Sequence, residues 1–298
     1  MEENMLQFDV TDAKKVRVII DSDTACEADD PFAIAYALMS PKLMVKAIVA
    51  EHFARPGSVE KSYAAALRVT RAMGSGVPVF RGEEGPGCGG EASEGVREII
   101  REARREDPHP LYLLCMGALT NIARAFSEAP DIMKKVTVVT IGGHPYDLEE
   151  IPWKEFNFGN DPDAANKVLQ SEAEVWQIPS DVYGSIRVGL AELQEQVKPY
   201  GEIGAYLFDQ MVAYNGTPEA AWTAGESWSL GDSPSVAAVL HPMCGRKGMQ
   251  QVRHVNEDTG YGPPEGEKKI LVYRDLDSRY LLGDFYAKLH LLYPAGNK

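Results

Sequence analysis

The chain has 298 residues, of which 44% are hydrophobic and 25% are charged, and its formal net charge at pH 7 is −14. This length suffices for one large α/β domain, or two smaller ones, with a substantial hydrophobic core. The acidic balance argues against a nucleic-acid-binding protein, because affinity for the phosphate backbone comes mainly from clustered Lys and Arg. It favours a neutral or cationic ligand instead, such as a metal ion.

The sequence shows no pattern of a signal peptide or a membrane span. Residues 1–15 lack the basic start and apolar stretch of a signal peptide, and no later segment approaches about 18 consecutive apolar residues. We therefore expect a cytoplasmic protein that makes no contact with a membrane.

Short apolar runs alternate along the chain with longer segments of helical periodicity. The runs are apolar on both faces, which is typical of buried parallel strands. We expect such strands at 16–20, 44–50, 111–117 and 136–143. We expect helices between and after them at 30–40, 58–74, 119–130 and 161–170. The alternation predicts βαβ units that build an open, mostly parallel central sheet flanked by helices, in a single domain over 1–298.

Two segments rich in glycine and charged residues interrupt this pattern. Residues 81–95 predict a mobile loop, after which the alternation of strand and helix resumes. Residues 260–269 predict a second loop, followed by a strand-like segment at 270–276 and a closing helix at 279–292. Ligands of open α/β sheets bind outside the carboxyl ends of the strands, so functional residues are expected there.

An acidic cluster stands at the first of these strand ends. Five acids fall within ten residues: Asp21, Asp23, Glu27, Asp29 and Asp30. A single Asp at a helix start is explained by capping, but five like charges repel one another, and burying each costs several kcal/mol unless it is paired or bound to a cation. Oxygen ligands alone select calcium or magnesium over zinc, so the cluster predicts a site for a hard cation.

Residues 21–38, DSDTACEADDPFAIAYAL, resemble the amino-terminal signature of the inosine-uridine nucleoside hydrolase family. The common form is D-x-D-x-x-x-D-D, and the longer D-x-D-x(5)-D-D form here, with an added acid such as Glu27, resembles one branch of the family. Residues 113–123, LLCMGALTNIA, resemble the family segment in which a backbone carbonyl joins the metal. The matching carbonyl is that of Met116.

Two later segments extend the resemblance over most of the chain. Residues 155–165, EFNFGNDPDAA, match the pattern E-F-N-x-x-x-D-P-x-A-A, whose Glu and Asn hold sugar hydroxyls. The resemblance assigns these roles to Glu155 and Asn157. Residues 229–242, SLGDSPSVAAVLHP, resemble the segment where the last metal-binding Asp precedes an apolar helix, which assigns that role to Asp232.

The resemblance implies the nucleoside hydrolase fold and calcium-dependent hydrolysis of the N-glycosidic bond of ribonucleosides, giving ribose and free base. Asp23 would also be the base that takes a proton from water, and Asp29 would contact the substrate and favour its developing positive charge. A homo-oligomer, a dimer or tetramer, is implied as well. The implied calcium ligands are Asp23, Asp30, Asp232 and the Met116 carbonyl.

The chain departs from the family pattern where the departing base would be protonated. Many members carry a His immediately before the last metal-binding Asp, and this chain has Gly231 there. Many also carry a Gly-Asn pair after the second strand, where this chain reads AEHFARPG, so that His52, Phe53 or Ala54 lies near the corresponding position. His52 or His144 could supply the proton instead, or Trp228 or Trp153 could stack on the base, although packing explains each of them as readily.

Two other functions fit parts of the sequence. A non-catalytic protein of the same fold that binds a pentose or nucleoside agrees with Gly231 and the altered AEHF segment. A phosphatase of the haloacid dehalogenase type would use IIDSDT as its nucleophile loop, with Asp21 phosphorylated and Asp23 as acid/base partner. The early helix start after Asp30 leaves no room for the usual flap of that superfamily, and EFNFGNDPDAA has no role in it.

Overall fold

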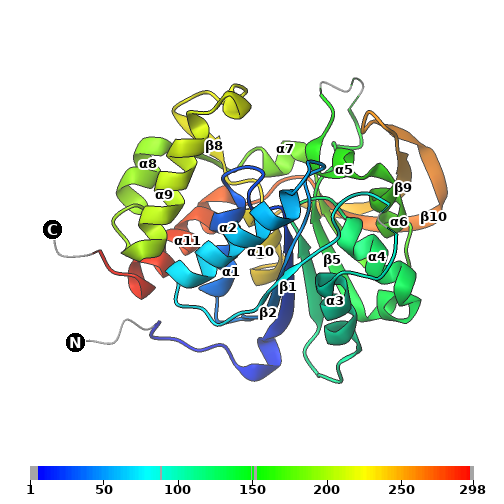
Figure 1. The fold of residues 1–298 in the computed structure, drawn as a ribbon, viewed down its shortest axis with the longest axis horizontal. Helices are drawn as coiled ribbons and strands as arrows, with labels where there is room; N and C mark the ends of the chain where they lie inside the picture. Colours follow the sequence, from blue (N-terminus) through cyan, green and yellow to red (C-terminus); the bar gives the residue numbers. More distant parts are fainter. Residues whose placement is uncertain (1–5, 88, 149, 151–152, 296–298) are drawn as a thin grey trace.

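The structure is a computed structural model that describes residues 6–87, 89–148, 150 and 153–295. In this part of the chain an eight-stranded sheet forms the centre of the molecule (Figure 1). The strands pair in parallel, except that β9 runs antiparallel to β10. Across the sheet their order is β3 (Val79–Arg81), β2 (Leu43–Ala50), β1 (Val16–Ser22), β4 (Leu111–Cys115), β5 (Val136–Ile141), β6 (Glu174–Ile178), β10 (Tyr261–Tyr273) and β9 (Lys247–Val255).

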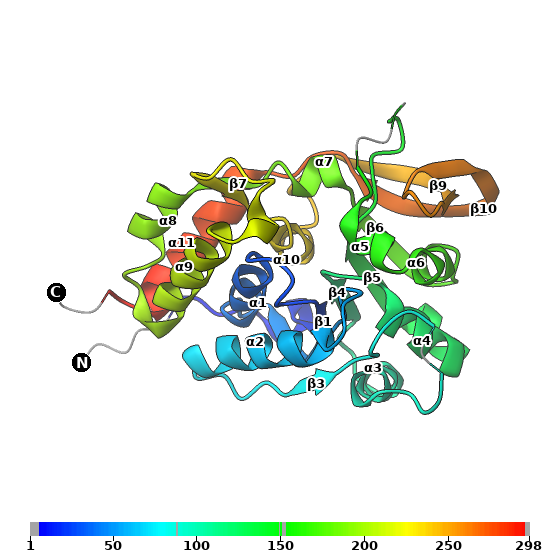
Figure 2. The same ribbon diagram turned by 45° about the horizontal axis from the view of Figure 1, so that its top comes forward.

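Helices cover both faces of the sheet, as Figure 2 shows. One layer contains α1 (Asp30–Leu38), α2 (Ser58–Ala72), α9 (Gly201–Asn215), α10 (Ser233–Leu240) and α11 (Ser278–Leu292). The other contains α3 (Glu94–Arg104), α4 (Thr120–Glu128) and α6 (Pro162–Leu169).

Each face of the sheet therefore has its own hydrophobic core. Successive side chains of a strand point to opposite faces. In β1, Val18 and Ile20 accordingly pack into the core with α1, whereas Ile19 packs into the core with α4. All three side chains are fully buried. The prediction of a mostly parallel sheet between helices is confirmed.

Short elements cluster near the edge of the sheet where β1, β4 and β5 end, which is the upper edge in Figure 1. These elements lead into the segments that carry candidate functional residues. They include α5 (Phe156–Asn160), α7 (Ser180–Tyr183), β7 (Arg187–Gly189) and β8 (Ser227–Ser229). Helix α8 (Leu190–Gln196) and a short 3-10 helix at Pro218–Ala220 lie on the side of α9, and 3-10 helices at Asp12–Lys14 and Pro130–Lys135 directly precede β1 and β5 at the opposite edge of the sheet. Strands β7 and β8 pair with each other as a separate two-stranded sheet.

The loop predicted at 260–269 is wrong, because this segment is the first part of β10. The register between β10 and β9 shifts on either side of Pro264, so the strand accommodates its prolines in an irregular stretch of the ladder. The loop predicted at 81–95 agrees with the structure, in which β3 ends at Arg81 and α3 begins at Glu94.

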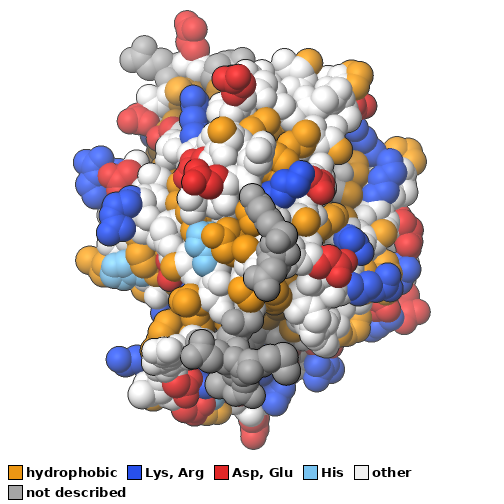
Figure 3. All heavy atoms as spheres, turned by 90° about the vertical axis from the view of Figure 1, so that its left-hand side faces the viewer, with side chains coloured by type: hydrophobic (Ala, Val, Ile, Leu, Met, Phe, Trp, Pro, Cys, Tyr) orange, Lys and Arg blue, Asp and Glu red, His pale blue; other side chains and the backbone are white. Residues whose placement is uncertain are grey.

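The side of the molecule that carries α8, α9 and α11 is seen in Figure 3. Hydrophobic side chains there are interspersed with charged and polar ones. None of the helices in the described ranges is long and apolar enough to cross a membrane. The cytoplasmic location and the oligomeric state stay predictions.

Candidate active site

The carboxyl ends of β1 and β4 bring together two of the predicted metal ligands, Asp23 and Met116. The two strands pair in parallel up to Asp21 and Cys115, and the Met116 N–H donates to the Asp21 carbonyl at 2.8 Å. Gly117 allows the Asp23 carboxyl to approach this backbone, because a Cβ at Gly117 would lie only 3.0 Å from the Asp23 Cγ. The Asp23 Oδ2 is buried and has no hydrogen-bond partner.

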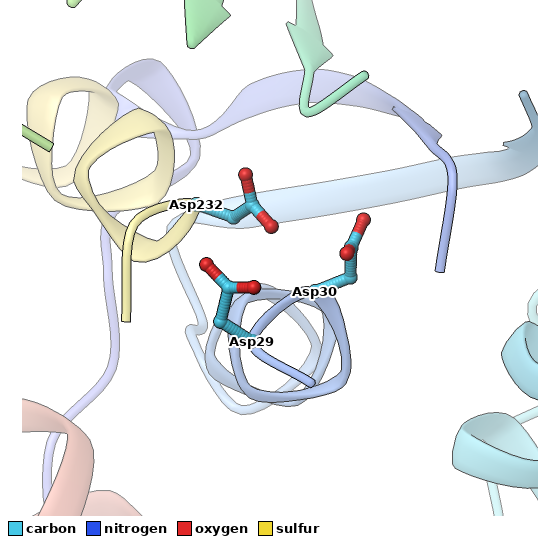
Figure 4. A group of neighbouring side chains, drawn as sticks. All are labelled: Asp29, Asp30 and Asp232. Carbon is cyan, nitrogen blue, oxygen red and sulfur yellow. The ribbon is translucent and has the colours of Figure 1, made fainter. Parts of the chain in front are cut away.

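Three more carboxylates converge beside this point. Asp29 is the N-cap of α1, Asp30 is its first residue, and Asp232 is the N-cap of α10. Both helices carry a proline in their first turn, which is preorganised for a helix start. Figure 4 shows the three carboxylates pointing toward one another. One oxygen of each lies within 4.8 Å of the others, and all three residues are buried.

Burial and like charge dominate the electrostatics of this group. Burial raises the pKa of Asp23, Asp29 and Asp232 well above the usual range, and the charges of neighbouring carboxylates raise it further. Burial also raises the pKa of Asp30 to about 6, although the Ser22 hydroxyl donates to its Oδ1 at 2.6 Å.

The donor set fits a hard cation. Within the described ranges no Lys or Arg forms an ion pair with Asp23, Asp29, Asp30 or Asp232. Buried carboxylates without a counter-charge are strongly unfavourable, and a divalent ion with oxygen ligands removes this cost. The tightest group includes Asp29, which the sequence assigned to the substrate, and Asp23 lies next to it.

Glu155 and Asn157 come to the same edge of the sheet from α5. Glu155 is the N-cap of this helix and accepts the backbone N–H groups of Asn157 at 3.2 Å and Phe158 at 2.9 Å. The Asn157 side-chain amide donates to the Ile141 carbonyl at 3.0 Å and, at 3.5 Å, to the Met116 carbonyl. These hydrogen bonds therefore fix Glu155 at the start of α5 and hold the Asn157 side chain between the end of β5 and the Met116 carbonyl, the predicted metal ligand.

A second pair of acids lies beneath Asp23. Asp21 and Glu51 are fully buried, and both are held by Asn121. The Asn121 side chain donates to the Asp21 Oδ1 at 2.8 Å, and its backbone N–H donates to the Glu51 Oε2 at 3.2 Å. Burial raises the pKa of Asp21 to about 7 and that of Glu51 well above its usual range, which favours the protonated form of each acid. A fully buried Asp21 is unsuited to be the nucleophile that the phosphatase alternative requires.

His52 and His144 are fully buried, and protein groups engage both ring nitrogens of each. The His52 Nδ1 accepts the Ala54 N–H at 3.1 Å, and its Nε2 lies 2.7 Å from the Thr120 hydroxyl. The His144 Nδ1 lies 3.2 Å from the Ser180 hydroxyl, and its Nε2 donates to the Trp153 carbonyl at 3.0 Å. Neither imidazole has a free nitrogen for a substrate, so the predicted substrate contact of His52 has no support in this geometry.

The two candidate tryptophans differ in exposure. Trp228, predicted to contact the substrate, is only 3% exposed and belongs to the core. Its ring packs against Tyr214 and Trp222, with centroid distances of 5.6 and 5.3 Å. Trp153 is 55% exposed and contacts the His144 ring at 5.2 Å. Of the two, only Trp153 presents a ring that is open to solvent.

Two further residues, Glu27 and Tyr183, lie among the candidate functional side chains, although no motif assigns a role to either of them. Burial, and after it the charges of Asp30 and Glu155, raise the pKa of Glu27 to about 7, so this added acid lies close to the same cluster. The Tyr183 hydroxyl donates to the Glu155 Oε1 at 3.0 Å. Tyr183 follows β6, a strand that we did not predict, and recognising that strand would have placed Tyr183 at the functional edge of the sheet.

Buried carboxylates and an oriented Asn lie together at the carboxyl ends of parallel strands. This arrangement is typical of an α/β protein that binds a hard cation and a small polar ligand. The chain matches the model of the inosine-uridine preferring nucleoside hydrolase family over residues 18–279. It belongs to this family of enzymes, which confirms the resemblance seen in the sequence. The phosphatase alternative is thereby set aside.

Relatives and solved structures agree with this assignment. The chain is 28% identical over 256 residues to the pyrimidine-specific ribonucleoside hydrolase RihA of Salmonella arizonae, covering 76% of this chain and 77% of that protein. A solved plant nucleoside hydrolase superposes with a TM-score of 0.76 at 19% identity, covering 92% of this chain and 98% of that one. A purine-preferring ribonucleoside hydrolase from Gardnerella vaginalis superposes with a TM-score of 0.71 at 22% identity, covering 93% and 98%.

Proposed function

We propose that the chain hydrolyses the N-glycosidic bond of ribonucleosides with a bound calcium ion, giving ribose and free base. The observation that carries this proposal is the convergence of Asp29, Asp30 and Asp232 within 4.8 Å of one another, beside Asp23. The names of two relatives, one pyrimidine-specific and one purine-preferring, support ribonucleosides as the substrate class. The proposal covers this class and no particular base.

Asp23, Asp30 and Asp232, together with the Met116 carbonyl, would hold the calcium ion, and Asp29 lies close enough to share in this. When bound, the ion supplies a fixed positive charge that neutralises these acids and can orient two sugar hydroxyls and a water. Calcium prefers such an all-oxygen set of carboxylates and carbonyls.

Four side chains of the protein have separate roles in the reaction. Asp23, whose Oδ2 is buried without a partner, takes a proton from water while the water oxygen bonds to C1′ and the base leaves with the electron pair of the glycosidic bond. Glu155 and Asn157 orient the sugar, which can supply several kcal/mol of the barrier. The negative charge of Asp29 favours the oxocarbenium character of the sugar as the base departs.

The test is release of ribose and free base from a panel of ribonucleosides in calcium buffer. Because Glu155 and Asn157 are proposed to read hydroxyls, kcat/KM for 2′-deoxyuridine should fall below that for uridine by a factor of about 10⁴, as at sites built to hydrogen-bond a hydroxyl. Asp23→Asn should abolish turnover. Comparable kcat/KM for the two nucleosides would overturn the assignment of Glu155 and Asn157 to the sugar hydroxyls. Full activity of Asp23→Asn would overturn the role of Asp23 as the group that takes a proton from water.

A second candidate is a nucleoside-binding protein without turnover. It is favoured by Gly231, which has no side chain to protonate a departing base, and by the engagement of both ring nitrogens in His52 and His144. Calorimetric binding of ribonucleosides without release of reducing sugar would establish this alternative.

A further inference from the structure

Tyr183 occupies a position among the acids of the site that no sequence motif marks. It is the last residue of α7 and is partly exposed. Its hydroxyl donates to the Glu155 Oε1 at 3.0 Å. Glu155 itself is fully buried, so the phenol contacts the proposed sugar-binding carboxylate in the protein interior.

The Tyr183 ring fills the space beside Gly231. A Cβ placed on Gly231 would lie 3.3 Å from the Tyr183 Cδ2 and 3.2 Å from the Asp29 Oδ2, which is tighter than ordinary contact. The residue before Asp232 therefore leaves room for an aromatic ring from another element. Tyr183 forms a wall of the site next to Asp29 and Asp232.

The phenol of Tyr183 is neutral, and its O–H group already donates a hydrogen bond to Glu155. Burial raises the pKa of Tyr183 well above its usual range, and the charges of Glu155, Glu27 and Asp232 act in the same direction. A neutral phenol has one O–H donor and acceptor lone pairs. Because the donor points to Glu155, the lone pairs remain for a partner that donates.

We propose that Tyr183 is a substrate-positioning residue whose phenol oxygen accepts a hydrogen bond from one hydroxyl of the sugar while it holds Glu155 in place. This inference rests on the proposed function, since it takes a ribonucleoside as the ligand. A sugar hydroxyl fits because it donates one hydrogen bond and accepts another. It can therefore bridge the phenol oxygen and the remaining lone pairs of the Glu155 carboxylate.

The test compares Tyr183→Phe with wild type on one ribonucleoside and its 2′-, 3′- and 5′-deoxy analogues. Phe keeps the ring that packs beside Gly231 and removes only the hydroxyl. We expect kcat/KM for the parent nucleoside to fall by about 10- to 100-fold, the range for losing a hydrogen bond that involves a charged group. For the analogue that lacks the contacted hydroxyl, the same substitution should cost less than about 3-fold, because that bond is already absent.

A matched control is available in Tyr286, whose hydroxyl donates to the Glu192 Oε1 at the same distance, 3.0 Å, on an exposed surface. Tyr286→Phe removes an equivalent Tyr–Glu hydrogen bond outside the site. It should leave kcat/KM unchanged for all four substrates, and equal losses in the two variants would contradict a specific role for Tyr183.

The remaining outcomes separate this inference from the proposed function. Wild-type rates in Tyr183→Phe, or the same loss on all four substrates, would contradict the sugar contact. If wild type cleaves none of the substrates, the proposed function fails, and calorimetric binding of D-ribose in calcium buffer decides the contact. A Kd weakened by about 10-fold or more in Tyr183→Phe supports the contact, and an unchanged Kd overturns it.

Discussion

Asp30 and Asp232 present carboxylate oxygens within 4.8 Å of each other, although one begins α1 and the other caps α10. The two residues are only 2% and 5% exposed. Helix N-termini favour a carboxylate by about 0.3–1 kcal/mol at exposed sites, which is small beside the cost of burying two like charges. A divalent cation between them would resolve this conflict, and its removal should have a measurable effect on stability.

Chelation should abolish activity and lower the melting temperature, and added calcium should restore both. A ligand that binds only the folded chain stabilises it by about 2.7 kcal/mol at 100 times its Kd. Melting in the presence of EDTA and then excess calcium measures the effect. Asp232→Asn should reduce the calcium response, whereas Asp277→Asn should retain it, because Asp277 caps α11 without belonging to the acidic group. An unchanged melting temperature and activity after exhaustive chelation would refute the metal site.

The increase in melting temperature on adding calcium should become larger as the pH rises. The pKa of Asp30 is raised in the folded chain from 3.8 to about 6, so the folded state binds more protons than the unfolded state between these values. Without metal, this contribution to stability is fully present below the unfolded pKa and is lost as the pH rises through the folded pKa. Asp23, Asp29 and Asp232 extend the loss to higher pH, since their pKa values are raised further.

Calcium binds the deprotonated carboxylates, so its affinity should increase over the same range. Melting curves at pH 5, 6, 7 and 8, each with EDTA or with calcium, test this expectation. The difference in melting temperature between the two conditions should widen with pH. A difference that is constant or narrows would contradict the proton linkage.

The acidic cluster and the first strand and helix could be predicted because their signals are local. The apolar run of β1 and the acids that follow it are contiguous, and parallel strands place their carboxyl ends at one edge. The match of 155–165 to a family pattern located Glu155 and Asn157 without any strand assignment. These parts of the site depend on short segments whose geometry the sequence constrains directly.

The rest depends on contacts between distant segments. Strand β6 contains the polar Gln177, which is fully buried because its side-chain amide donates to the Gly142 carbonyl at 2.9 Å and to the Tyr261 hydroxyl at 2.8 Å. No local sequence pattern indicates such partners, so neither the strand nor the Tyr183 that follows it can be predicted from the sequence. The hydrogen bonds of His52 with Ala54 and Thr120 cannot be predicted from the sequence for the same reason.

Asn121→Ala should destabilise the fold by about 2–4 kcal/mol, because it leaves buried polar groups without partners. The side chain donates to Asp21 at 2.8 Å and accepts the Glu83 N–H at 2.7 Å, and it is fully buried. Denaturant unfolding measures the change. Asn215→Ala is the matched control, since that amide also makes two hydrogen bonds, to Gly225 and Thr223, but at a more exposed position. Similar losses in the two variants would contradict a special role for the buried amide.

Departure of the nucleobase should depend on the quality of the leaving group. Gly231 offers no donor, and the ring nitrogens of His52 and His144 are engaged by the protein. Wild type should therefore strongly prefer a riboside with an activated leaving group, such as para-nitrophenyl riboside, over natural nucleosides. Replacing His52 or His144 by Gln should alter stability and leave the ratio of activated to natural rates unchanged. A basic limb in the pH profile of kcat that disappears in either variant would contradict this prediction.

Trp153 and Trp228 differ in solvent exposure, so they should differ in their effect on departure of the nucleobase. Trp153→Ala removes a ring that is 55% exposed, so it should lower kcat for natural nucleosides by about 10², spare the activated riboside and cost little stability. Trp228→Ala removes a core ring that is 3% exposed, so it should cost about 3–5 kcal/mol of stability and leave the rate ratio unchanged. The opposite assignment of the two effects would show that the core ring turns toward the base during turnover. If neither variant changes the rate ratio, the leaving group itself sets the rate and aromatic stacking has no part in its departure.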